Sequence, residues 1–140
     1  MLISREMVLD QDIGLHATLF GGDMMARMDK AAGIAASLVS RNRSFLTLKV
    51  SELLFHSPVR AGEILEFYAG IARQGNTSLT LRIEVQVYEP VSDRRRNVTS
   101  GEFVMVAVGE DQHPEPVKWK PEMVQLALGS PKVGGRANQS

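Results

Sequence analysis

The chain of 140 residues has the length of one ordinary domain, and 44% hydrophobic with 23% charged residues is the composition of a soluble globular protein. The charges of sixteen basic and sixteen acidic side chains cancel. The chain therefore has no net positive charge that would attract nucleic acid or an anionic membrane. Cysteine is absent, which excludes disulfides, thiolate metal sites and a cysteine nucleophile, and the three scattered histidines predict no metal site.

The first ten residues, MLISREMVLD, carry charges at Arg5, Glu6 and Asp10 and contain no long apolar run. They predict neither a secretory signal nor a membrane span, so we expect the protein in the cytoplasm. The stretch from Leu2 to Leu9 is typical of a short strand, and the polar turn DQDIGLHAT follows it.

A helix of about five turns is predicted next, from near Gly21 to Val39. The segment is rich in Met and Ala, which have high helix propensity, and its apolar positions fit helical spacing. The sequence SRNRS then ends the helix and begins a loop.

Four further strands are predicted from Phe45 onward, where the apolar period changes to two. Their sequences are FLTLKVSELLF, EILEFYAGIAR, TSLTLRIEVQVYE and VTSGEFVMVAVGE. In the third, from Thr77 to Tyr88, apolar side chains point one way and polar ones, including Gln86, the other, which predicts one dry and one wet face. The connectors are short and carry turn residues, so neighbouring strands are expected to be antiparallel. The chain is therefore predicted to be an α+β domain.

The pattern weakens beyond Gly109, where KWKPEMVQLALG indicates one short helix. The end of the chain, from Gly129 to Ser140, is rich in Gly, Ser, Asn and Lys and is expected to be disordered. We therefore assign residues 1–128 to a single domain and residues 129–140 to a disordered tail.

One acidic residue, Asp29, lies inside the Met and Ala segment. At helical spacing it shares a face with Met25 and Gly33 and with small Ala residues. Removing a carboxylate from water is costly unless it is paired, so the position needs a reason. Either Asp29 lies at the edge of the apolar face and pairs with Arg27, Lys30 or a sheet residue, or it serves a functional site.

The helix start offers a second functional feature, Gly21 and Gly22. Two glycines leave the first backbone N–H groups uncovered, and the helix dipole adds positive potential there, so a developing oxyanion could be held. Asp29 lies about two turns further along, roughly 10 Å of axial rise. The alternative is that the glycines only let the helix start pack closely on the sheet.

These residues resemble a known family. The segments TLFGG and MDKAAGIAA, followed by LTLKVSELLFHSPVRAGEILEFYAGIARQGNTSLTLRIEVQVY, carry the motifs FGG…MD, F.SPV..GE and R.GNTSLTL.IEV in order. Over about Val8 to Val108 the chain is similar to the hot-dog-fold acyl-CoA thioesterases, in the bacterial group related to the cytosolic long-chain acyl-CoA hydrolases.

The resemblance implies a hot-dog fold, in which a curved antiparallel sheet of about five strands wraps around one long central helix. It implies two subunits that join their sheets edge to edge, often as trimers of such dimers, which make a hexamer. The implied reaction is hydrolysis of a fatty-acyl or related acyl-CoA to the free acid and coenzyme A. No cofactor is required, and coenzyme A enters as part of the substrate and leaves as product.

The resemblance also implies roles for individual residues at a site between two subunits. Asp29 corresponds to the general base or nucleophile, and the backbone of Gly21 and Gly22 corresponds to the oxyanion donors. Phe20 corresponds to a residue that lines the acyl site. The turn formed by Asn76, Thr77 and Ser78 lies near bound coenzyme A in relatives, so these three residues are candidate contacts.

One departure from the family lies in the loop before the helix. Relatives commonly have an asparagine that orients the water or the carbonyl, and Gly14 stands at that position here, with Ala17 where some relatives have glycine. His16 could supply the missing hydrogen bond or act as a base, because histidine titrates near neutral pH. The alternative is that His16 is a loop residue exposed to solvent.

Two further sets of residues have weaker signals. Arg94 and Arg96, in the run Arg94 to Arg96, could meet the phosphates of coenzyme A, since guanidinium groups match phosphate oxygens. The alternative for them is a solvated hairpin loop. His56 is expected to end a strand.

Two other functions stay open. A non-catalytic acyl-CoA-binding or sensing protein is favoured by Gly14, because the family's amide is missing. A hot-dog hydratase or dehydratase would use a histidine and an acid on an enoyl thioester, but those families carry the two residues in a different sequence context.

Overall fold

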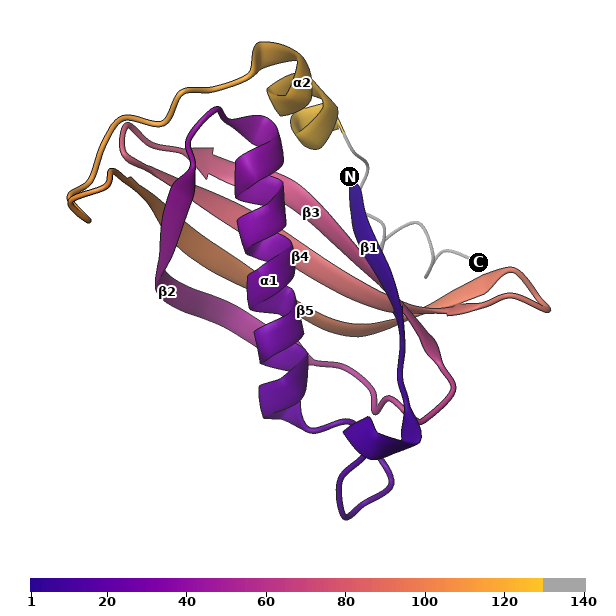
Figure 1. Ribbon diagram of the computed structural model, residues 1–140. Coiled ribbons are helices and arrows are strands. Elements are labelled where there is room, and N and C mark those ends of the chain that lie inside the picture. The colour runs from indigo at the N-terminus through magenta and orange to yellow at the C-terminus, as the bar shows by residue number, and fades with distance from the viewer. Residues whose placement is uncertain (130–140) are drawn as a thin grey trace.

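The computed structural model describes residues 1–129, in which one antiparallel sheet curves around a long helix (Figure 1). The strands are β1 (Leu2–Met7), β2 (Ser44–Phe55), β3 (Ile64–Gln74), β4 (Ser78–Glu89) and β5 (Arg94–Val108). Their order across the sheet is β1-β3-β4-β5-β2, so β1 and β2 are the two edges. The expected disordered tail lies outside the described residues, apart from Gly129.

The helix α1 (Gly21–Val39) has the predicted bounds at both ends. It buries seven side chains against the sheet, and most are small enough to bring the helix close: Met24, Met28, Ala31, Ala32, Ala35, Ala36 and Val39. Ser40 follows the last turn in an extended conformation, and its hydroxyl donates to the carbonyl of Ala36, which ends the helix. A short 3-10 turn η1 (Asp10–Asp12) precedes α1, and α2 (Pro121–Gly129) packs against β3 and α1, as the predicted short helix.

The predicted strands are confirmed, but β5 begins at Arg94, four residues before the expected Val98. Arg94 pairs with Glu89 and Asn97 pairs with Gln86 on β4, so the hairpin ladder continues through the arginines. The alternative in which this run is a hairpin loop is therefore wrong.

The dry face of β4 is confirmed, since Leu79, Leu81 and Ile83 are buried there. The prediction that Gln86 lies on the wet face is wrong, because its side chain is fully buried. Its Nε2 donates to Oδ1 of Asn97 at 2.6 Å, across the ladder pair, while its Oε1 has no partner among the described residues.

Edge strand β2 departs from a regular ladder at two bulges. The pairing with β5 shifts between Thr47 and Lys49 and again between Ser51 and Leu54. Glu52, inside the second bulge, has a φ of 52°. Bulges bend a strand and change which side chains face inward, and β2 is visibly bent beside α1 (Figure 1).

Candidate active site

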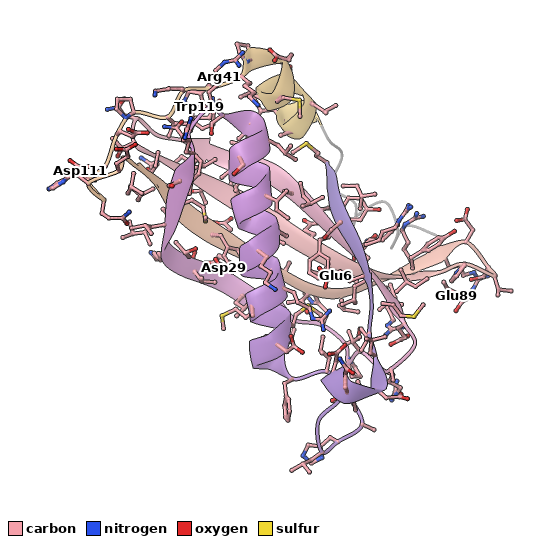
Figure 2. All side chains as sticks on the ribbon, in the orientation of Figure 1. Glu6, Asp29, Arg41, Glu89, Asp111 and Trp119 are labelled. Atoms are coloured by element: carbon pink, nitrogen blue, oxygen red, sulfur yellow. The ribbon has the colours of Figure 1, made fainter. Side chains whose placement is uncertain are left out.

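Asp29 lies on an exposed face of α1 that is turned toward the edge strand β2 (Figure 2). The hydroxyl of Thr47, in β2, donates a hydrogen bond of 2.6 Å to Oδ1 of Asp29. The helical face that Asp29 was expected to share is only partly covered, since Met25 and Ala26 are exposed and Ala32 is buried. Asp29 is therefore held by a hydroxyl at an open edge rather than buried in a core.

The alternative in which Arg27 pairs with Asp29 is wrong. Arg27 donates to Glu6 at 2.7 Å and to Asp23 at 3.1 Å, and it lies 3.2 Å from Asp12. Burial lowers the pKa of Arg27, but its hydrogen bonds to Asp23 and Glu6 outweigh burial and raise it. The expected sheet partner is confirmed instead, in the form of Thr47.

Sequence reasoning does not single out Thr47, because the contact depends on the first bulge of β2. Thr47 is the last paired residue before the register shift, and Leu48 is the extra residue that points out. The one usable signal is that Thr47 is one of two polar residues, with Lys49, in the alternation FLTLKV. Its hydroxyl also lies 3.5 Å from the sulfur of Met105.

The helix start presents uncovered backbone amides. Phe20 is the N-cap residue, in an extended conformation, and no side chain caps the helix. A Cβ at Gly21 would lie 3.3 Å from the ring of Phe55, whereas a Cβ at Gly22 would meet nothing within 4 Å. Close packing therefore explains Gly21, whereas no neighbouring atom requires a glycine at position 22. The first backbone N–H groups of a helix have no partner within the helix, so they can bind an anion.

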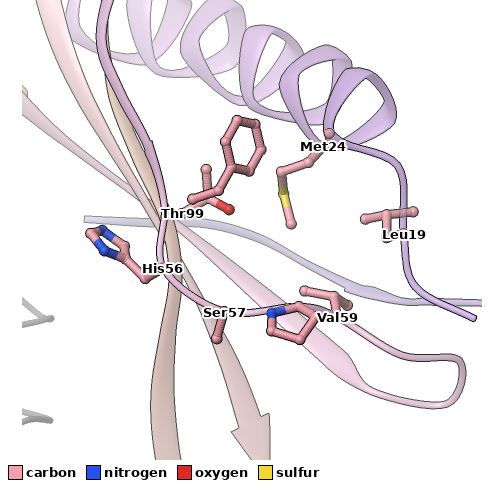
Figure 3. A pocket seen from close by; sticks show the side chains of 9 residues that line it. Leu19, Met24, His56, Ser57, Val59 and Thr99 are labelled. Atoms are coloured by element: carbon pink, nitrogen blue, oxygen red, sulfur yellow. The ribbon is translucent and has the colours of Figure 1, made fainter. Parts of the chain in front are cut away.

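A pocket of about 380 Å³ opens beside this helix start (Figure 3). Its lining is mostly apolar and comes from the chain around the start of α1, from the end of β2 and the following loop, and from β5: Leu19, Gly21, Met24, Phe55, His56, Ser57, Pro58, Val59 and Thr99. Figure 3 shows Met24 and Leu19 on one side and the hydroxyl of Thr99 on the other. Sequence reasoning missed this pocket, because its walls come from segments far apart in the chain.

His56 follows the last residue of β2, as expected for a residue that ends a strand. Its imidazole lies on the far side of the strand from Met24 (Figure 3), and its Nε2 is 3.3 Å from the hydroxyl of Ser100. His56 therefore contributes backbone rather than its ring to the pocket wall.

Comparison with known proteins decides the family. A model of the thioesterase superfamily matches residues 16–91, which include the helix start, Asp29 and Thr47. The chain belongs to this superfamily. The expected hot-dog fold is confirmed by solved structures of the same fold, described next.

Two relatives are similar over most of the chain. The acyl-CoA thioester hydrolase YciA of Salmonella typhimurium is 31% identical over 119 residues, which cover 83% of this chain and 89% of that protein. An uncharacterised acyl-CoA thioester hydrolase of Zymomonas mobilis is 32% identical over 131 residues, which cover 92% of this chain and 84% of that protein.

Two solved thioesterases have the same arrangement of helix and sheet. A hexameric thioesterase of Yersinia pestis is 31% identical, with a TM-score of 0.77 over 84% of this chain and 94% of that one. A hexameric hotdog-fold thioesterase of Campylobacter jejuni is 26% identical, with a TM-score of 0.77 over 90% of this chain and 95% of that one.

Asn76, Thr77 and Ser78 lie at the far end of this thioesterase fold from the helix start. Ser78 pairs with Val106, which pairs with Leu46 near the beginning of β2, whereas Gly21 touches Phe55 at the end of β2. The turn is held by the backbone, since Val117 N donates to Asn76 O. One chain therefore does not bring this turn to Gly21 and Gly22.

Arg96 lies on the pocket side of the sheet and is already engaged. It donates to both carboxylate oxygens of Glu63, at 3.0 and 3.1 Å, and to the hydroxyl of Ser57 and the carbonyl of Pro58. Burial raises the pKa of Glu63, but the bonds from Arg96 outweigh it and lower that pKa. Arg96 thus fastens the pocket loop to β5, which excludes a freely solvated turn, while Arg94 is exposed.

His16 lies at the tip of the loop before α1. The bridge between Ile13 and Leu19 closes the loop, and His16 is exposed, with no hydrogen bond to any described residue. The loop lies beyond the start of α1, whereas Asp29 is labelled well along the helix (Figure 2). The chain by itself does not bring His16 to Asp29.

Within residues 1–129 no group of three or more His, Asp or Glu side chains is placed to hold a metal ion. None of the described helices combines the length and the apolar character that a membrane crossing requires.

Proposed function

We propose that the protein is an acyl-CoA thioesterase that hydrolyses a fatty-acyl or related acyl-CoA to the free acid and coenzyme A. The observation that carries the proposal is the carboxylate of Asp29, held by Thr47 at an open, apolar edge of a thioesterase fold. The similar proteins of Salmonella typhimurium and Zymomonas mobilis bear the name of this activity, which supports the substrate class.

Asp29 acts as the general base. Its Oδ1 is fixed by Thr47, so Oδ2 can accept a proton from a water molecule that attacks the thioester carbon. The carbonyl oxygen becomes an oxyanion against the amides of Gly21 and Gly22 in a second copy of the chain, and the carbon–sulfur bond then breaks. The thiolate takes the proton back from Asp29 as it leaves. General-base action contributes about 10²–10⁴ in rate, and one oxyanion donor about 10²–10³.

The pocket beside the helix start receives the acyl group. Its walls are mostly apolar, as a hydrocarbon chain requires, and it borders Gly21, where the carbonyl oxygen is to be held. Its volume of about 380 Å³ lies near the lower end of the range of about 300–1,000 Å³ that is usual for ligand sites.

The site is completed by a second copy of the chain. Asp29 and Gly22 lie roughly 10 Å apart along one helix, so these two residues of one chain cannot both contact the same thioester carbonyl. Leu46 and Leu48 are exposed on β2, and Ile34 and Leu38 are exposed on α1, the helix that packs against β2. An unpaired apolar edge is a template for pairing.

A two-fold pairing of β2 edges runs the two sheets in opposite directions. The Asn76 turn of the second copy would then lie at the end where this chain has Gly21. This geometry supports Asn76, Thr77 and Ser78 as contacts for coenzyme A across the interface, with Arg94 as a further contact for its phosphates. The hexamers of Yersinia pestis and Campylobacter jejuni support assembly beyond the dimer.

Thiol release from acyl-CoAs of rising chain length tests the proposal. We expect wild type to hydrolyse one length class and Asp29→Asn to lose at least about 100-fold in kcat, the lower bound for a general base, while its circular dichroism is unchanged. Asp111→Asn is the matched control, because Asp111 is an exposed acid in a distant turn (Figure 2). An equal loss in both variants would contradict the role of Asp29.

A binding protein without turnover is the second candidate, and Gly14 is the observation that favours it. Isothermal titration with a hydrolysis-resistant acyl-CoA separates the two functions. Tight binding by a wild type that releases no thiol would establish the second candidate and overturn the first.

A further inference from the structure

Gly14 and Phe20 are in direct contact at the start of the candidate site. A Cβ built on Gly14 would lie 2.4, 2.6 and 2.8 Å from three carbons of the Phe20 ring, which is closer than real Cβ atoms approach a neighbour. The ring therefore occupies the space of a side chain at position 14. Phe20 is at the same time 57% exposed, so its ring can move into solvent when position 14 carries a side chain.

The backbone on both sides of this contact is fixed by hydrogen bonds. Gly14 N donates to Thr18 O at 2.9 Å, and Ala17 N donates to Gly14 O at 3.2 Å. On the other side, Leu19 N donates to Val59 O and Phe20 O accepts the first helical bond from Met24 N. A side chain added at position 14 must therefore displace the ring rather than the chain.

The ring lies next to the proposed oxyanion donors, since Phe20 directly precedes Gly21 and Gly22. On Gly14 it forms a fixed apolar wall next to them. Away from Gly14 it would either extend into solvent or lie across the first helical turn. Either position changes how a thioester approaches the amides.

We propose that Gly14 is a positioning residue, which keeps the Phe20 ring on the loop and so holds open the approach to the helix-start amides. This inference rests on the proposed function for its kinetic consequence but not for the contact itself. Glycine at position 14 then has a structural use in this chain, because a Cβ there would meet the ring as it is placed here.

The substitution Gly14→Ala tests the contact between position 14 and the Phe20 ring. Gly14 does not have a positive φ, so Gly14→Ala fits the backbone and adds only the Cβ that meets the ring. We expect it to raise KM for acyl-CoA about tenfold, a middle value for two residues in contact, with a smaller change in kcat. Gly70→Ala is the matched control, since a Cβ there meets only one atom, at an ordinary 3.8 Å.

A double-mutant cycle distinguishes positioning from a general effect on the loop. Phe20→Leu shortens the ring to a side chain that can clear position 14. In that background we expect Gly14→Ala to change KM less than about twofold, since the two effects share one contact. A full tenfold effect of Gly14→Ala in the Phe20→Leu background would overturn the inference.

Proton NMR tests the contact without relying on activity. The α-protons of Gly14 under an aromatic ring should be shifted upfield in wild type and return to ordinary values in Phe20→Leu. Unshifted protons in wild type would overturn the inference whatever the activity. A shifted pair in a wild type that releases no thiol would instead support the contact while overturning the proposed function.

Discussion

The two edges of the sheet are built in opposite ways. β1 is a strand of six residues whose charges are paired within the chain: Arg5 bonds Glu66 at 2.7 Å, and Glu6 accepts a bond from Arg27. β2 has twelve residues, two bulges and exposed leucines, of which Leu48 is 70% exposed. Asp29 faces β2 rather than β1.

The difference shows which edge of the sheet is complete within one chain and which edge is not. Charges satisfied within the chain make the β1 edge a poor partner for another strand, whereas apolar side chains on the β2 edge lower their free energy only when something covers them. The candidate catalytic carboxylate lies at the incomplete edge. Function and assembly are therefore expected to fail together when β2 is changed.

The largest expected effect comes from charging the β2 edge. Leu46→Glu with Leu48→Glu would place like charges opposite each other in a two-fold contact, so we expect monomers and a loss of at least about 100-fold in thiol release. Sedimentation velocity measures the assembly. Met7→Glu, at an exposed residue of β1, is the control and should keep both assembly and activity. Dissociation by the β1 variant alone would reverse the assignment of the two edges.

The second-largest effect is expected on stability, at Glu66 of β3, which pairs with Arg5 of β1. Glu66 is fully buried, and Arg5, Arg95 and Tyr68 all donate to it. Glu66→Gln should lower the free energy of unfolding by about 1.5–3 kcal/mol, the range for hydrogen bonds to a charged group, and leave thiol release within about twofold. Urea unfolding measures the first quantity. A large loss of activity at unchanged stability would show that the β1 side also serves the site.

The same carboxylate makes stability depend on pH. Burial raises the pKa of Glu66, but the bonds from Arg95, Arg5 and Tyr68 outweigh burial and lower it below its ordinary 4.5. A lowered pKa contributes stability that is present above the ordinary value and is lost as pH falls through the value in the folded protein. The difference in the free energy of unfolding between wild type and Glu66→Gln should therefore shrink as the pH falls into the acid range. A difference that does not change with pH would contradict this.

A smaller effect is expected at Thr47. Thr47→Val removes the bond to Asp29 and keeps the shape, so kcat should fall about tenfold, equivalent to one hydrogen bond to a charged group. Assembly should persist. Thr80→Val makes the same change on the outer face of β4 and should have no kinetic effect. If both variants are fully active, the hydroxyl of Thr47 does not orient the base.

The smallest effect concerns the strain in β2. Glu52 has a φ of 52°, a conformation that costs a side-chain-bearing residue roughly 1–2 kcal/mol. Glu52→Gly relieves this strain but adds entropy to the unfolded chain, so we expect a net gain of about 0.5–1 kcal/mol in thermal unfolding. A loss of stability would mean that the Glu52 side chain, not the bulge, stabilises this part of β2.

Much of the fold could be predicted because it depends on local patterns. The bounds of α1 follow from its Met and Ala content, from Gly21 at its start and from the polar run after Val39. The strands follow from alternation. The pattern failed at Gln86, because burial there comes from polar neighbours on the adjacent strands, and at Arg94, because pairing with Glu89 extends the hairpin.

The site was less predictable, because its geometry depends on irregular features. Asp29 stood out as a carboxylate among small residues, but its partner Thr47 reaches it through a bulge that alternation does not reveal. The contact between Gly14 and Phe20 joins two ends of a loop, and the sequence indicated only that an amide was missing at position 14. A single chain also cannot reveal which residues of a second copy complete the site.

Mixing two defective variants tests most directly whether two copies share one site. Asp29→Asn lacks the base, and Gly22→Pro lacks one amide, in a first helical turn where proline is tolerated and Gly21 has no Cβ to oppose it. Each should be inactive alone. When the two are co-refolded, half of the dimers are mixed and each mixed dimer has one intact site, so about a quarter of wild-type thiol release should return. If no activity returns although the mixed dimers form, Asp29 and Gly22 do not act together across two copies.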